Sequence, residues 1–209
     1  MKASQAFGII VLLAAFSAFA ADSEPSALVK SNVGEVLTVL KQSKDKRALQ
    51  DLAEQKISTH FDFRAMTQFA VGKTWREASP EQQQRLEKAF RGLLVRTYTT
   101  ALSQSSMADV AVDVKPVQLK PNQEDVTVKS VATQSGKQPV AIDYRMSRTG
   151  NGWKVYDVII ENLSLVTNYR DSFASEIGRS GIDGLIKTIE AKNQSLTGAS
   201  LAGVGFDTA

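Results

Sequence analysis

Hydrophobic residues recur at helical spacing in the first half of the chain and again near its end. The spacing predicts two amphipathic helices between residues 26 and 60, a third within residues 61–75 that stops at Gly72, and a long one over residues 79–104. Ser79 suits the N-cap of the long helix and Pro80 its first position. After Ser164 the helical pattern returns, and "GRSG" separates a last helix from the one before it.

The middle of the chain alternates between apolar and polar residues with a period of two. The segments "ADVAVDVKPV", "DVTVKSVATQ", "QPVAIDYRMSR" and "WKVYDVIIEN" predict four antiparallel strands, with hairpin signals at "SGK" and "TGNG". In the last segment, strict alternation would put Trp153 and Val155 on one face and Val158 and Ile160 on the other. A strand that is apolar on both faces is expected in the centre of the sheet.

This order of helices, meander sheet and helices predicts one α+β domain, which we place at residues 21–195. The preceding segment has the features of a signal peptide cleaved after Ala20: Lys2, an apolar stretch, and small residues at Ala18 and Ala20. An uncleaved anchor is the alternative, although the apolar run falls short of the roughly 20 residues that span a bilayer. Residues 196–209 have no period and are expected to be disordered.

Composition limits the possible cellular compartments and the possible classes of binding partner. The 209 residues include no cysteine, which argues against a lipoprotein and against a disulfide-stapled scaffold. An exported domain of this kind in a bacterial cell would be periplasmic. The net charge of +3 falls to +2 without Lys2, too small a positive charge for nucleic-acid binding.

The sequence offers little catalytic chemistry. With one histidine and no cysteine, we expect no metal site and no cofactor. Carboxylate catalysis remains open, because Asp62, Asp143 or Asp157 could act with Tyr144 or Tyr156 as an acid–base pair. The structural alternative is that Asp143 faces solvent and Asp157 forms hydrogen bonds within the sheet or at a helix end.

The predicted elements carry a large amount of apolar surface that must be covered in the folded protein. The long helix, the segment after residue 60, the fourth strand and the helix after Ser164 each present a broad apolar face. These faces either cover one another as ordinary core or enclose a cavity for a hydrophobic ligand.

Several motifs resemble those of a known family. The segments "FDFRAMTQFAVGKTWREASPEQQQRLEKAFRGLLVRTY", "DYRM", "GWKVYDVIIENLSLVTNYRDSF" and "GIDGLI" resemble the MlaC family, or toluene-tolerance auxiliary component family, of periplasmic phospholipid-binding proteins. The resemblance covers about residues 26–192. One departure is Asn162, which stands where the family usually has glycine; asparagine still tolerates a positive φ.

The resemblance implies an NTF2-like fold, with a curved four-stranded antiparallel meander sheet wrapped by N-terminal and C-terminal helices around an apolar pocket. It implies a carrier that binds the acyl tails of a glycerophospholipid and catalyses no reaction. It also implies two partners, an outer-membrane lipoprotein–porin complex and an inner-membrane ABC transporter with an MCE-type protein. Shuttling lipid between them would maintain the lipid asymmetry of the outer membrane.

Eleven apolar or aromatic side chains are the candidates for contact with lipid, and each could instead be plain core. They are Phe69, Phe90, Leu94, Tyr98, Ile142, Tyr144, Val158, Ile160, Val166, Tyr169 and Phe173. Arg145, Arg148 and Arg170 are candidates for contact with the headgroup or with an acidic docking surface, the alternative being that they are simply solvated.

Two other functions stay open. One is an enzyme on a cone-shaped fold that uses an Asp/Tyr acid–base pair on a small hydrophobic substrate. The other is an adaptor with a solid core, which a cavity too small for an acyl chain would favour.

Overall fold

The computed structural model describes residues 24–42, 46–55, 57–104 and 109–198 of the chain. The predicted signal peptide and residues 199–209 of the predicted tail lie outside these ranges. The helices are α1 (Glu24–Gln42), α2 (Lys46–Gln55), α3 (Phe63–Val71), α4 (Pro80–Gln104) and α5 (Arg170–Gly198), with short 3₁₀ helices η1 (Ile57–His60), η2 (Gly72–Arg76) and η3 (Thr167–Tyr169). The strands are β1 (Ala111–Val114), β2 (Asp125–Thr133), β3 (Val140–Thr149), β4 (Gly152–Ile160) and β5 (Leu163–Ser164).

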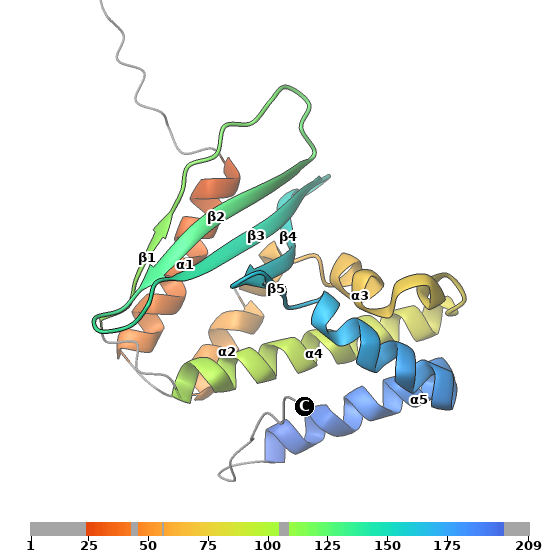
Figure 1. Ribbon diagram of the computed structural model, residues 1–209. Coiled ribbons are helices and arrows are strands. Elements are labelled where there is room, and N and C mark those ends of the chain that lie inside the picture. Colours follow the sequence, from red (N-terminus) through yellow and green to blue (C-terminus); the bar gives the residue numbers. More distant parts are fainter. Residues whose placement is uncertain (1–23, 43–45, 56, 105–108, 199–209) are drawn as a thin grey trace, which may run out of the picture.

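The fold is α+β, as predicted from the alternation of patterns. The strands form one antiparallel sheet in the order β1-β2-β3-β4-β5, a meander with one short strand more than the four expected. Figure 1 shows α1 lying along the sheet, while α4 and α5 form a helical layer beneath it and α2 lies between α1 and α4. Within the described ranges, no helix is both long enough and apolar enough to cross a membrane.

The strict alternation expected for β4 is wrong, because the strand contains a β-bulge. The register with β3 pairs Met146 with Val155 but Arg145 with Asp157, so Tyr156 is one extra residue on β4. Beyond it the side chains exchange faces. Trp153, Val155, Val158 and Ile160 therefore belong to one hydrophobic cluster rather than to opposite faces.

The expectation that the fourth strand is central is also wrong. β3 is the middle strand of the sheet, and β4 meets β5 over only two residue pairs. Elsewhere its free edge is partly covered by the chain before α3: Phe61 forms a parallel bridge with Val155, and the backbone N–H of Asp62 donates to the Val155 carbonyl at 2.8 Å. The apolar character of β4 thus reflects cover from helices and loops rather than two neighbouring strands.

Helix boundaries follow the signals in the sequence. The Ser79 hydroxyl accepts from the backbone N–H of Gln82 (3.2 Å), whose side chain accepts in turn from the Ser79 N–H (3.0 Å), a capping box at the start of α4. The carboxylate of Asp62 caps α3 by accepting from the Ala65 N–H at 2.9 Å. Gly72 ends α3 with a φ of 70°, as expected.

After β4, the helix begins later than predicted from the sequence, but it is interrupted at the predicted place. Asn162 adopts a φ of 67°, so the turn that the family builds with glycine is kept. Ser164 lies in β5, and regular helix begins only at Arg170. Gly181 has a φ of 71° and a ψ of −176°, and there the chain turns back so that the second half of α5 runs beneath α4 (Figure 1).

The interior divides into two hydrophobic clusters. The helical core combines α3, α4 and α5 around side chains such as Phe90, Leu86 and Ile186. The sheet core packs one face of the sheet, including Val128 and Met146, against α1. Phe61 packs against both clusters, which places the segment before α3 at the boundary between them.

Candidate apolar binding site

Two adjoining cavities lie at the boundary between the helical core and the sheet core. Their volumes are about 210 and 270 Å³. Val36, Phe61 and Leu102 line both, so the two spaces are separated by shared side chains rather than by a layer of core. Together they reach the range of about 300–1,000 Å³ that is typical of small-molecule sites. The interior is therefore not solid, which removes the support for an adaptor with a filled core.

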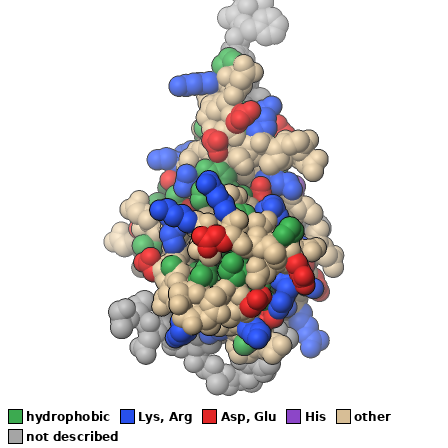
Figure 2. Space-filling model, turned by 90° about the vertical axis from the view of Figure 1, so that its right-hand side faces the viewer, with side chains coloured by type: hydrophobic (Ala, Val, Ile, Leu, Met, Phe, Trp, Pro, Cys, Tyr) green, Lys and Arg blue, Asp and Glu red, His purple; other side chains and the backbone are tan. Residues whose placement is uncertain are grey.

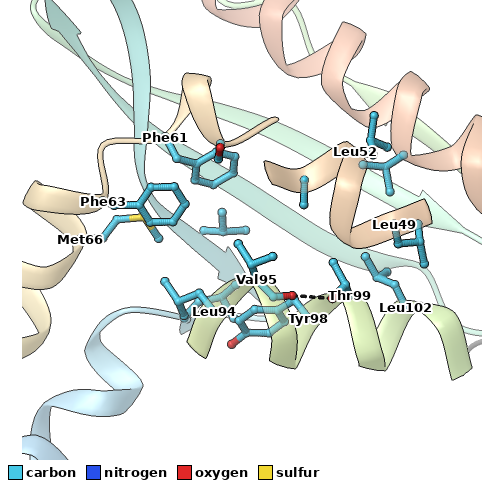
Figure 3. A pocket seen from close by; sticks show the side chains of 15 residues that line it. Leu49, Leu52, Phe61, Phe63, Met66, Leu94, Val95, Tyr98, Thr99 and Leu102 are labelled. Carbon is cyan, nitrogen blue, oxygen red and sulfur yellow. Dashed lines mark hydrogen bonds between the residues drawn. The ribbon is translucent and has the colours of Figure 1, made fainter. Parts of the chain in front are cut away.

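The first cavity lies between α2, α4 and the segment that leads from η1 into α3, with β4 behind it (Figure 3). One face of α4, from Leu94 to Leu102, contributes a stripe of residues to the cavity. Leu49 and Leu52 of α2 lie opposite this stripe. The lining consists of Val36, Leu49, Leu52, Ala53, Ser58, Phe61, Phe63, Met66, Leu94, Val95, Tyr98, Thr99, Leu102, Val158 and Leu165.

The second cavity lies between α1 and the inner face of the sheet. Its lining consists of Val29, Asn32, Val33, Val36, Leu37, Leu40, Phe61, Leu102, Val110, Val112, Ala132, Ile142, Tyr144 and Val155. None of the described side chains that line either cavity is charged. Such a lining can solvate hydrocarbon but offers nothing to hold an ion inside.

The polar groups of the lining are largely satisfied by the protein. The Thr99 hydroxyl donates to the Val95 carbonyl in its own helix at 2.6 Å, and Ser58 donates to the Glu54 carbonyl at 2.7 Å. Burial raises the pKa of Tyr98 well above its ordinary value of 10.0, and the neighbouring Tyr169 adds to the effect. Burial likewise raises the pKa of Tyr144. Both shifts favour the neutral phenol, so neither side chain brings a charge into the cavities.

Five of the eleven candidate lipid contacts line the cavities. Leu94, Tyr98 and Val158 line the first, and Ile142 and Tyr144 line the second. These residues come from α4, β3 and β4, and the fold brings them together around Phe61.

The other six candidates lie elsewhere. Phe90, Val166, Tyr169 and Phe173 pack in the helical core, where the ring centroids of Phe90 lie 5.1 Å from Tyr169 and 5.3 Å from Phe173. Ile160 packs against the sheet core. Phe69 is 44% exposed and stacks on Tyr156 at 5.5 Å between centroids.

None of the three candidate arginines lines the apolar cavities; Arg148 and Arg170 are exposed, and Arg145 is half-buried. The Arg145 guanidinium lies 5.1 Å from the centroid of the Tyr156 ring, and that of Arg148 lies 5.1 Å from the Trp153 ring. Arg170 donates to the Phe69 carbonyl through Nε (3.2 Å) and Nη2 (2.8 Å). Figure 2 shows the end of the molecule formed by α3 and the first half of α5, where hydrophobic side chains reach the surface among charged ones.

The largest group of lining residues missed by sequence reasoning comes from α1, α2 and the chain around α3. Val36, Leu52, Phe61 and Met66 belong to stripes that the helical spacing identifies as apolar. The spacing predicts that such a stripe is buried, but which of its members face empty space depends on the tertiary arrangement.

Of the candidate carboxylates, Asp157 forms hydrogen bonds within the sheet, as the structural alternative expected. Asp157 is 3% exposed and accepts from the Ser164 hydroxyl and from the Val166 N–H. Asp143 pairs with Lys129 across the sheet and lies half-buried on the face away from the cavities, and Asp62 caps α3. Across the described residues, no group of three or more His, Cys, Asp or Glu side chains could hold a metal ion.

Comparison with known proteins now identifies the family. The family model described as MlaC protein matches residues 30–191. The chain belongs to the MlaC family. It is 29% identical over 191 residues to the toluene tolerance protein ttg2D of Pseudomonas putida, a match that spans 88% of this chain and 86% of that protein.

A solved structure of an MlaC-like fold carries a ligand. The phospholipid-binding protein of Ralstonia solanacearum, solved in complex with a phospholipid, superimposes with a TM-score of 0.74 at 37% identity. The match covers 85% of this chain and 99% of that one. The two proteins therefore share one fold over most of the length of this MlaC family member.

Proposed function

We propose that the protein is a periplasmic phospholipid carrier that shuttles lipid between an outer-membrane lipoprotein–porin complex and an inner-membrane ABC transporter with an MCE-type protein. Transport between these complexes would maintain the lipid asymmetry of the outer membrane. Membership of the MlaC family and the phospholipid held by the Ralstonia solanacearum relative support the ligand class. The signal-peptide pattern of residues 1–20 supports export.

The observation that carries the proposal is the uncharged hollow between the two cores. Each methylene removed from water contributes about 0.8 kcal/mol, so two acyl tails gain on the order of 20 kcal/mol on burial. A carrier that crosses an aqueous space must enclose most of that surface. Tails that enter the adjoining cavities would contact Leu94, Tyr98, Ile142, Tyr144 and Val158, and the side chains on the opposite helices.

The proposed carrier catalyses no reaction. Asp157 is engaged in structural hydrogen bonds, and Asp143 and Tyr144 are adjacent on β3, where alternation points them to opposite faces. An acid and a base on opposite faces of a sheet do not meet one substrate. Arg145, Arg148 and Arg170 are better placed for an acidic surface on a partner than for the interior, because none of them lines the apolar cavities and Arg148 and Arg170 are exposed.

Organic extraction of protein purified without detergent tests the proposal. Mass spectrometry of the extract is expected to find phospholipid in a near-stoichiometric ratio to protein. A clean extract, together with failure of the protein to take up phospholipid from vesicles, would contradict it. Transfer between vesicles bearing the two partner complexes then tests the shuttling step separately from binding.

A further inference from the structure

A third cavity, which is polar and has a volume of about 660 Å³, lies between α2, α4 and α5. Four of the side chains that line it are basic, Arg85, Lys88, Arg91 and Arg96, and two are acidic, Glu54 and Glu190. The lining therefore has an excess of positive charge. This is the opposite of the uncharged lining of the two apolar cavities.

Arg91 stands at the junction of the polar and apolar spaces. Its Nη2 donates to the Ser58 hydroxyl at 3.0 Å, and its guanidinium carbon lies 5.4 Å from the centroid of the Phe63 ring. Ser58 and Phe63 both line the first apolar cavity, whereas Arg91 itself lines the polar one. Arg91 also forms an ion pair with Glu54. One residue thus contacts the boundary of both spaces.

The side chains along a single stripe of α4 also change from apolar to cationic. Leu102, Thr99 and Val95 line the apolar cavity, and Arg91 and Lys88 follow one and two turns further toward the start of the helix. A ligand lying along this stripe would meet hydrocarbon at one end and cations at the other. That is the distribution of polarity in a glycerophospholipid.

We infer that the polar cavity receives the phosphate of the bound phospholipid, with Arg91 and Lys88 as its cationic partners and the tails passing Ser58 and Phe63 into the apolar cavities. This inference rests on the proposed function. A guanidinium suits a phosphodiester because its planar donors can form two parallel hydrogen bonds. The ion pairs of Arg91 with Glu54 and of Arg85 with Glu190 are between partly exposed side chains, so an entering phosphate can displace the carboxylates.

The opposite end of the hollow offers no comparable site. There the second cavity is lined by side chains such as Leu37, Leu40, Val110 and Val112, and Asn32 and Tyr144 are its polar ones among the described residues. A phosphate at that end would find no cation in the lining. The charge distribution therefore orients the lipid with its headgroup toward α5.

A paramagnetic tag can locate the phosphate directly. Because the chain has no cysteine, Gln194→Cys at the polar cavity and Ser135→Cys at the β2–β3 hairpin each give a unique site for a nitroxide. In protein loaded with phosphatidylglycerol, the tag at position 194 is expected to broaden the phosphorus NMR signal several-fold more than the tag at 135. Equal broadening, or stronger broadening from position 135, would overturn the inference.

Substitution of the cationic partner separates headgroup recognition from tail binding. Arg91→Gln is expected to weaken uptake of phosphatidylglycerol about tenfold while leaving uptake of a diacylglycerol with the same tails unchanged, and the exposed Lys187→Gln serves as a matched control. Equal loss of both ligands would assign Arg91 to the fold and contradict the inference. A protein of native sequence that takes up neither ligand would contradict the proposed function instead.

Inorganic phosphate distinguishes a headgroup site from a general anion site. In lipid-loaded protein the headgroup is expected to exclude added phosphate, so the tag at position 194 should leave the free phosphate signal unbroadened. Broadening of that signal would show that the cavity stays open to anions when lipid is bound, and would overturn the assignment.

Discussion

The hydroxyl of Ser164 donates to the carboxylate of Asp157 at 2.7 Å across the turn that joins β4 to β5. The same carboxylate accepts from the backbone N–H of Val166 at 3.3 Å, and Ser164 accepts in turn from the N–H of Thr167. Asp157 therefore holds the chain that leads from the sheet into α5. Because Val158 and Leu165 line the first cavity on either side of this turn, the network also fixes one edge of the candidate site.

Asp157→Ala is expected to destabilise the protein by about 2–4 kcal/mol, because it leaves buried donors on Ser164 and Val166 without an acceptor. Denaturant unfolding of the two proteins measures the difference. Asp143→Ala is the matched control on the neighbouring strand, where a half-buried carboxylate should change the free energy of unfolding by less than about 1 kcal/mol. Equal effects of the two substitutions would contradict the role given to Asp157.

The turn at Gly181 depends on a backbone conformation open only to glycine. With a φ of 71° and a ψ of −176°, this residue lies where a Cβ is strained even though its surroundings are open. Gly181→Ala is expected to lower the free energy of unfolding by about 1–3 kcal/mol. Gly178→Ala, on the helical side of the turn and equally open, should be neutral or stabilise by up to about 1 kcal/mol. A neutral Gly181→Ala would show that the two halves of α5 can rearrange.

Local signals made most of the fold predictable. The capping residues Ser79 and Asp62 and the terminator Gly72 act within a few residues of themselves, so both ends of α3 and the start of α4 can be read from the sequence. The bulge at Tyr156 cannot, because one extra residue in a strand leaves no trace in its composition. It becomes visible only in the pairing with β3, and it reverses the faces assigned to Val158 and Ile160.

The candidate site was predictable in kind but only partly in position. Phe90 and Tyr98 belong to the same apolar stripe of α4, yet Phe90 packs against rings of η3 and α5 whereas Tyr98 lines the cavity. Sequence spacing predicts that both face the interior. Whether a buried side chain meets another side chain or an empty space is decided by elements distant in sequence, here α5 for the first and α2 for the second.

Filling the shared boundary of the two cavities should remove lipid without unfolding the protein. Val36 lines both spaces and is only half-buried, so Val36→Trp can place its ring in the hollow. Displacing about four methylenes of a tail costs about 3 kcal/mol, or about a hundredfold in affinity. Phospholipid per protein after detergent-free purification checks this, with Leu163→Trp at a 70% exposed position as the control. Unchanged lipid content in Val36→Trp would place the tails elsewhere.

Three partly buried tyrosines predict a loss of stability at high pH. Burial raises the pKa of Tyr98, Tyr144 and Tyr169 above the 10.0 of an unperturbed tyrosine, so the folded protein keeps these phenols neutral after the unfolded chain has begun to ionise. The unfolded state then binds fewer protons than the folded state. Their contribution to stability is complete below about pH 10 and declines as the pH rises toward their folded pKa values.

Tyr98→Phe isolates the part of this effect that comes from the first cavity. The free energy of unfolding, followed by denaturant titration from about pH 8 to 11, should fall less steeply in Tyr98→Phe than in the native sequence, because one ionising group has been removed. Tyrosinate absorbance of the folded native protein should correspondingly show phenols that resist ionisation. Parallel curves for the two proteins, with all four tyrosines ionising together near pH 10, would mean that water reaches the cavity lining in the folded state.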